Sequence, residues 1–160
     1  MYRGSSFLPR KSARFLDSIV SVIARAEPLL WEIDVNCYTP ENIKRLLGFR
    51  GTLINAFRPY HPSDILVTKI MLGVFGNVPA FDTNFKTGFG VSTFGPRSLE
   101  KVASFYKNNR RTIEQYRVAT LAFETGRPTN RRYTRAKVID MIFFIEGARA
   151  RKKPSSKGEA

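Results

Sequence analysis

The apolar positions of this chain recur at helical spacing over most of its length, with Gly and Pro residues between the repeats. The first repeat follows Ser12, a residue type that caps helices, and ends before Pro28. Thr39-Pro40-Glu41 predicts another start, because it combines a capping hydroxyl, proline at the first helical position and an early acid. Two glycines then interrupt the pattern, so residues 52–57 are predicted as a separate short helix.

The middle of the chain holds the strongest apolar segment. Residues 29–36 fit either a further helical turn or a short extended piece, with Trp31 and Ile33 buried in both cases. Residues 64–75 are apolar on nearly every side of a helix that is too short to span a bilayer, which indicates the buried central helix of an all-α fold. After a loop, Asp82 is placed to cap a short helix that carries two phenylalanines.

The last third alternates apolar helical repeats with basic segments. A long helix is predicted to begin within residues 96–98 and to reach Thr120, followed by a basic loop over residues 126–132. Apolar residues between 138 and 145 predict a final helix. The sequence therefore predicts one all-α domain, a bundle of about six helices around the central one.

The predicted domain spans residues 1–147, with a basic N-terminal arm, and a basic disordered tail follows over residues 148–160. The first acid is Asp17, and four bases precede it: Arg3, Arg10, Lys11 and Arg14. An organelle transit peptide would also fit that stretch, but an ordinary basic arm is the preferred interpretation. We expect a cytoplasmic or nucleoid-associated protein.

Composition excludes several classes of protein. With 160 residues and 42% hydrophobic content, the chain can pack one core and is not wholly disordered. The single cysteine, Cys37, excludes a disulfide scaffold and a cysteine-based metal site. The single histidine, His61, argues against a histidine-rich metal centre, so we expect no metal and no cofactor. We interpret Cys37 as a small buried or half-buried thiol and His61 as a turn or capping residue.

Charge points to a polyanionic partner and not to a membrane. The chain carries a formal charge of +14, and residues 101–160 hold 15 bases against 5 acids, a net +10. No apolar run approaches the ~18 residues of a membrane span. We expect nucleic acid as the partner, DNA and RNA both being open, and the sequence leaves protein partners undefined. The alternative is a basic surface that serves only solubility.

The candidate phosphate-binding residues lie in the basic segments of the last third. They are Lys107, Arg110, Arg111, Arg117, Arg127, Arg131, Arg132, Arg135, Arg149, Arg151, Lys152 and Lys153. Three tyrosines, Tyr106, Tyr116 and Tyr133, lie within or beside these segments and could stack on unpaired bases.

Two residues are candidates for chemistry, although the usual hydrolase and nucleotide-binding motifs are absent. Asp82 follows a rigid Val-Pro-Ala-Phe approach from the end of the central helix, which would fix its direction. Lys69 interrupts that apolar helix. Either its stem lies along the core while the ammonium reaches water, or it is a desolvated amine that could act as a nucleophile.

The segment around Asp82 resembles a known family. An apolar helix, a glycine and a short turn before Val-Pro-x-x-Asp-Thr-Asn resemble, over residues 64–90, the core of helix-hairpin-helix DNA glycosylases. The resemblance implies that Asp82 assists cleavage of the base–sugar bond, with Thr83 and Asn84 in place of the family's Thr and His. The family's Gly-x-Gly hairpin is replaced here by Tyr60-His61-Pro62.

Three functions remain open from the sequence. The first is nucleic-acid binding without catalysis, through the basic last third. The second is a glycosylase-like base-excision enzyme with Asp82 as its carboxylate. The third is a structural component of a ribonucleoprotein or defence complex.

Overall fold

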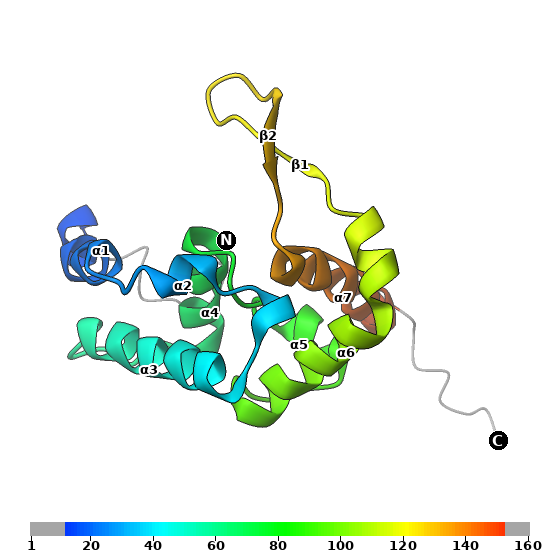
Figure 1. The fold of residues 1–160 in the computed structure, drawn as a ribbon. Helices are drawn as coiled ribbons and strands as arrows, with labels where there is room; N and C mark the ends of the chain where they lie inside the picture. The colour runs from blue at the N-terminus through cyan, green and yellow to red at the C-terminus, as the bar shows by residue number, and fades with distance from the viewer. Residues whose placement is uncertain (1–11, 153–160) are drawn as a thin grey trace.

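The computed structural model describes residues 12–152, which form a mostly helical single domain with one small hairpin (Figure 1). The prediction of an all-α fold is confirmed, with seven α-helices in the described part of the chain. The elements are α1 (Asp17–Ala24), α2 (Leu29–Glu32), α3 (Pro40–Ala56), α4 (Asp64–Val74), α5 (Thr83–Phe89), α6 (Pro96–Gln115), β1 (Ala119–Leu121), β2 (Pro128–Arg132) and α7 (Arg135–Lys152). Short 3-10 helices cover Ala13–Leu16 and Val35–Cys37.

Helix α3 begins where the sequence predicts but does not break at its glycines. The Thr39 hydroxyl accepts a hydrogen bond from the backbone N–H of Asn42 at 3.2 Å, which is the expected N-cap. The predicted division before residue 52 is wrong, because the helix runs on to Ala56. A glycine inside a helix costs only about 1 kcal/mol, and burial of the apolar stripe that includes Leu46 and Leu53 offsets it.

In the segment after α1, the prediction that Trp31 is buried is wrong. Residues 29–32 form a single helical turn, and Ile33 is extended and buried as predicted. Trp31 is 52% exposed instead of buried, and its ring lies against Phe75 with centroids 4.4 Å apart. The indole therefore covers the rim of the core.

Helix α4 is the central element that the apolar pattern predicts. The Ser63 hydroxyl accepts from the backbone N–H of Leu66, Val67 and Met71 are fully buried, and only Gly73 of the helix is exposed. At its end Gly76 adopts a left-handed conformation (φ 67°) and its N–H reaches the carbonyls of Met71 and Leu72, a turn that favours glycine.

Helices α5 and α7 cross at very close range. A Cβ atom at Gly147 would lie 1.8 Å from the backbone oxygen of Asn84, and one at Gly88 would lie 2.2 Å from that of Phe143. Only glycine allows this approach. Beside the crossing, rings of α5, α6 and α7 pack edge to face: Phe85, Phe89, Phe105 and Phe143. This crossing fixes the helix that Asp82 begins.

The region after α6 differs most from the sequence prediction. The long helix ends at Gln115 and is kinked at Asn109, whose backbone is not helical (φ −119°, ψ 18°). Thr120 lies on strand β1, and most of the predicted basic loop is strand β2. The strands are antiparallel, with Ala119 opposite Arg132, because the six residues that join them are too few for a parallel crossover.

The hairpin stands away from the helical body (Figure 1). In the described chain no residue between Ile113 and Ala136 belongs to the buried core. Helix α7 continues to Lys152, so the tail predicted from residue 148 is helical over its first five positions. Residues 153–160 and the N-terminal arm up to Lys11 lie outside the described residues. No helix within residues 12–152 is both long and apolar enough to cross a membrane.

Candidate nucleic-acid interface and the pocket beside it

The loop between α4 and α5 is held by side chains from several other elements. The Tyr38 hydroxyl donates to the backbone oxygen of Asn77 at 2.6 Å, and the Asn77 amide donates to the Leu30 carbonyl at 3.1 Å. The backbone N–H of Phe81 donates to the buried Thr68 hydroxyl at 2.9 Å. Burial raises the pKa of the Tyr38 phenol well above its usual value, so it remains a donor. The loop therefore presents Asp82 in one fixed orientation.

Asp82 and Lys69 meet as an ion pair. One carboxylate oxygen of Asp82 accepts from the backbone N–H of Phe85 at 3.0 Å, which confirms the predicted N-cap of α5. Its other oxygen lies 3.5 Å from the Lys69 ammonium, and the two side chains are 14% and 30% exposed. The structure thus brings together the two residues that the sequence singled out for chemistry.

A second carboxylate–ammonium pair, from α7, lies next to the first. Asp140 is buried, accepts from the backbone N–H of Ala80 at 2.9 Å and pairs with Lys137 at 3.0 Å. Burial raises the pKa of Asp140 above its usual value against the opposing effect of Lys137, and the charge of Asp82 raises it further. Sequence reasoning missed this pair: its i,i+3 spacing is a local signal, but its position beside residues 80 and 82 arises only in the folded chain.

These two pairs line a pocket of about 860 Å³ whose opposite side is the base of the hairpin. Its apolar rim comes from α4 and α7 and includes Leu72, Met141 and Phe144. Thr120, Arg131, Arg132 and Tyr133 of the hairpin and its flanks complete the lining. The pocket therefore joins a carboxylate–lysine wall to arginines that face solvent.

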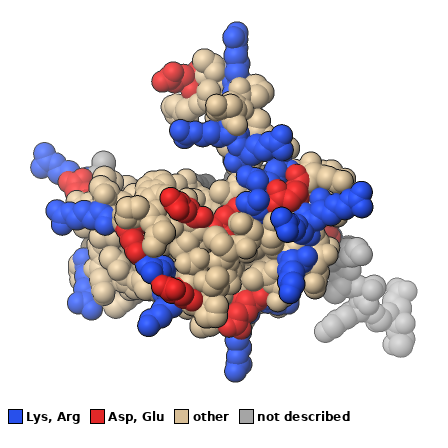
Figure 2. Space-filling model, in the orientation of Figure 1, with Lys and Arg blue, Asp and Glu red and all other residues tan. Residues whose placement is uncertain are grey.

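The hairpin carries three of the exposed arginines that the sequence predicts for phosphate contact. Arg127, Arg131 and Arg132 are all exposed, and Glu124 is the one acid between β1 and β2. Figure 2 shows basic side chains along the hairpin and at its root, whereas acidic and basic side chains are interspersed over the body in this view. Lys107, Arg110 and Arg111 are exposed on the part of α6 that leads toward the hairpin.

Two of the predicted phosphate contacts are occupied inside the protein. Arg135 donates to Glu114 at 2.5 Å and to Asp34 at 3.3 Å, and its Nε also reaches the Tyr106 hydroxyl at 3.1 Å. Arg117 donates to the Tyr133 carbonyl at 3.0 Å. Burial raises the pKa of Glu114, but the Tyr106 and Arg135 hydrogen bonds outweigh it, so this pKa is lowered overall. Arg117 thus closes the base of the hairpin, and Arg135 ties the start of α7 to α6 and to Asp34.

The remaining predicted contacts lie at the end of α7. Arg149 pairs with Glu146 at 3.0 Å, Arg151 donates to the Asn84 side chain at 3.3 Å, and Lys152 is exposed. Lys153 lies outside the described residues. These residues line the end of one helix and do not border the pocket.

The aromatic residues proposed for base stacking are placed differently from one another. Tyr106 is buried and hydrogen bonded to Glu114, so its prediction as a stacking residue is wrong. Tyr116 is exposed and Tyr133 lines the pocket. Sequence reasoning missed Phe123, which lies in the connection between the strands and is fully exposed. Its signal is an aromatic residue directly before a turn-forming Glu-Thr-Gly segment.

The fold and the site together define a small helical protein with a projecting basic hairpin beside a carboxylate–lysine pocket. Among the described residues, no three His, Cys, Asp or Glu side chains are grouped so that they could hold a metal ion. Comparisons with protein-family models, curated proteins and solved structures find no match for this chain.

Proposed function

We propose that this protein binds nucleic acid through the basic hairpin formed by residues 116–134. The observation that carries the proposal is the placement of Arg127, Arg131 and Arg132 on an element that projects from the body. Guanidinium groups on a narrow projection reach backbone phosphates without a clash between the protein body and the helix of the nucleic acid. The exposed basic residues of α6 extend the same positive surface: Lys107, Arg110 and Arg111.

The net charge of +14 supports this proposal over a surface that serves only solubility. Magnitudes of about 2–8 are enough to keep a small domain soluble. Excess positive charge on a small domain destabilises it through self-repulsion, unless a polyanion neutralises it. A polyanionic partner would be stabilising at the hairpin, where the three arginines face one acid.

A salt titration with a matched pair of variants tests the proposal. Binding to labelled duplex DNA, single-stranded DNA and RNA is measured by anisotropy from low to moderate salt, for the wild type and for Arg127→Ala/Arg131→Ala/Arg132→Ala. We expect affinity to fall by roughly tenfold or more in the triple variant. On duplex DNA the negative slope of log K against log salt should become shallower by about 3, since each phosphate contact contributes about −0.9 to it.

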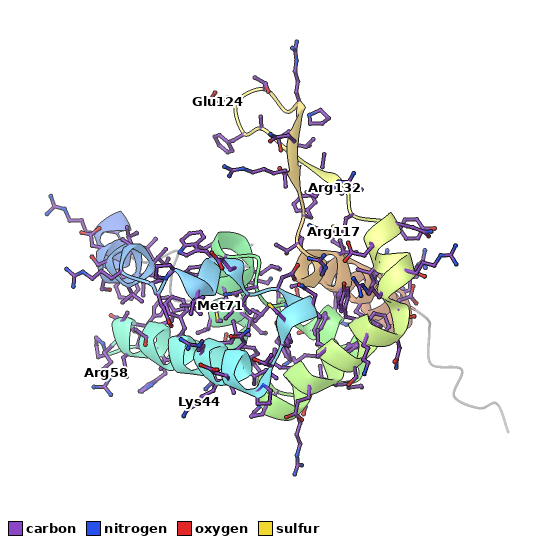
Figure 3. All side chains as sticks on the ribbon, in the orientation of Figure 1. Lys44, Arg58, Met71, Arg117, Glu124 and Arg132 are labelled. Carbon is purple, nitrogen blue, oxygen red and sulfur yellow. The ribbon has the colours of Figure 1, made fainter. Side chains whose placement is uncertain are left out.

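The control removes three positive charges elsewhere, with Arg25→Ala/Lys44→Ala/Arg58→Ala. Figure 3 shows Lys44 and Arg58 at the end of the body far from the hairpin, and all three residues are exposed. The control should keep the wild-type slope. If both triple variants lose affinity alike, binding depends on total charge and not on the hairpin. If the wild type binds none of the three nucleic acids, the proposal is wrong.

A second candidate function is glycosylase-like base excision in the pocket beside the hairpin. The observation that favours it is the Lys69–Asp82 pair, 3.5 Å apart on a pocket of about 860 Å³ that opens beside the proposed phosphate contacts. A carboxylate placed in this way could stabilise an oxocarbenium-like sugar after the base leaves the stack.

This second candidate is tested with duplexes that carry damaged or modified bases. Asn caps helices as well as Asp does, so Asp82→Asn should keep the α5 cap and remove only the negative charge. We expect abasic sites from the wild type and a rate lower by about 10² or more in the variant. No abasic product across a broad panel would exclude base excision and leave the binding proposal intact.

A further inference from the structure

The tip of the hairpin is a closed turn and not a loose loop. The backbone N–H of Ala122 donates to the carbonyl of Arg127 at 2.8 Å, and the N–H of Gly126 donates to that of Ala122 at 2.8 Å. Gly126 is in the left-handed region (φ 64°), where glycine is favoured. The backbone N–H of Arg127 also donates to the Thr125 hydroxyl at 3.3 Å. These bonds hold residue 123 at the outer end of the element.

Phe123 is 103% exposed, as much as in an extended peptide, and Leu121 beside it is 59% exposed. The Thr120 and Thr129 hydroxyls, 2.6 Å apart, form a hydrogen bond between the two strands. The strands therefore stay paired close to the tip. Burial of a phenylalanine removes a large apolar surface from water, and this ring gains none of that benefit within its own chain. An aromatic ring on a defined projection is therefore placed to contact a partner.

The residues around the Phe123 ring are mostly positively charged, which favours an anionic partner. Arg127 lies in the same turn, Arg131 and Arg132 lie on the stem, and only Glu124 opposes them. Figure 3 shows Glu124 at the end of the hairpin and Arg132 nearer its root. An exposed ring at the tip of a stem that carries arginines matches a partner with negative charges and flat apolar faces. A nucleic acid offers both, since its phosphates are anionic and its bases are flat.

We propose that Phe123 stacks on the face of a nucleobase while the arginines behind it contact phosphates. The proposal rests on the nucleic-acid binding proposed above and assigns the base contact to the tip of the hairpin. The ring can enter a base step of a duplex as a wedge, or it can stack on an unpaired base; the recognised surface is the π-face of the base in both cases.

Two substitutions at this position test the stacking directly. For Phe123→Ala we expect affinity to fall about 5- to 150-fold, the range found when a stacking aromatic is removed, while the salt slope stays unchanged. For Phe123→Trp we expect affinity to be kept and the indole fluorescence to be quenched on binding, since stacked bases quench tryptophan. Trp31, on α2, is the internal control, because its emission in the wild type should not change.

A matched control removes a different exposed apolar side chain, Leu29→Ala on α2, and should bind as the wild type does. A larger loss in Phe123→Ala on duplex than on single strands indicates a wedge, and the reverse indicates stacking on unpaired bases. The Phe123 variants should keep the wild-type Tm, because this side chain is fully exposed in its own chain.

The outcomes that overturn the inference are separate from those that overturn the binding proposal. If the wild type binds with a steep salt slope, but Phe123→Ala binds equally well and the emission of Phe123→Trp is not quenched, the stacking is wrong and the binding stands. If sedimentation shows a dimeric wild type and a monomeric Phe123→Ala, the ring packs on a second copy of the chain and stacking is again wrong. If the wild type binds no nucleic acid, both proposals fail.

Discussion

Asp34 joins two parts of the chain that are about a hundred residues apart. Its carboxylate accepts from the backbone N–H groups of Arg135 and Ala136 at 2.8 and 2.9 Å, which are among the unpaired donors at the start of α7. It also accepts from Val35 at 2.7 Å and faces the Arg135 guanidinium. One buried carboxylate thus caps a long helix from outside it and fixes where that helix begins.

Removal of this carboxylate should be costly. We expect Asp34→Ala to lower the free energy of unfolding by about 3–5 kcal/mol, because it leaves two helix donors and a half-buried guanidinium without their partner. Thr39→Ala, which removes the cap of α3, is the comparison and should cost about 1 kcal/mol. Urea denaturation measures both; equal losses would show that Asp34 acts only as an ordinary cap.

Asp140 gives the protein a specific pH dependence. Its pKa is raised in the folded state by burial and by the charge of Asp82, so the folded protein binds this proton more tightly than the unfolded chain does. The stability that this proton contributes is fully present below the ordinary carboxyl pKa of about 4 and is lost as pH rises through the raised value.

The variant Asp140→Asn should isolate this effect, since the amide oxygen can still accept from Ala80 and carries no titrating proton. As pH falls from 7 toward 4, we expect the wild type to gain stability relative to the variant. Thermal or urea unfolding at several pH values checks the sign. A difference between the two proteins that is constant with pH would show that Asp140 does not titrate in this range.

At the scale of elements, the contact between α5 and α7 depends on the absence of side chains at the crossing. A Cβ at Gly147 would overlap the backbone oxygen of Asn84, and backbone cannot move aside as a side chain can. The same crossing orients α5, whose first turn holds the carboxylate of Asp82. The pocket is thus shaped partly by two glycines that do not line it.

We expect Gly147→Ala to destabilise the fold by about 3 kcal/mol or more through overpacking. Gly48→Ala and Gly51→Ala in α3 are the matched controls, because a Cβ at either position would have no atom within 4 Å apart from its chain neighbours and the adjacent backbone of its own helix. Alanine there should stabilise the helix by about 0.5–1 kcal/mol. If the Tm of Gly147→Ala equals that of the two controls, α5 and α7 can move apart without loss of stability.

At the scale of the whole molecule, the hairpin is attached to the body by few contacts. Arg117 at its root donates to Glu114 of α6, as does Arg135 directly after it. No residue between Ile113 and Ala136 is part of the buried core of the described chain. The element proposed to bind nucleic acid is thus separate from the core that keeps the protein folded.

Replacement of residues 120–131 by Gly-Gly, which joins the paired positions 119 and 132, should therefore leave the Tm close to that of the wild type. Nucleic-acid binding should be lost in the same variant. Differential scanning calorimetry and the anisotropy titration measure the two properties. Retained binding would place the interface on α6 or α7, and a collapse of the Tm would show that the hairpin supports the fold.

Part of this architecture follows from short-range patterns. The caps at Thr39 and Asp82 were predictable, because a capping side chain and the N–H from which it accepts are only three residues apart. The kink at Asn109 and the continuous α3 were not, since propensity differences of about 1 kcal/mol are decided by what the helix packs against.

The sequence alone determined that the chain folds as helices around an apolar α4, that its last third is strongly basic, and that Asp82 begins α5. Only the tertiary structure decided which of those basic residues face solvent: Arg135 is held by Asp34 and Glu114, whereas Arg131 and Arg132 stand on the hairpin. Capping and periodicity act within one or two turns. The partner of a charge, and the exposure of Phe123, depend on segments far apart in the chain that meet only on folding.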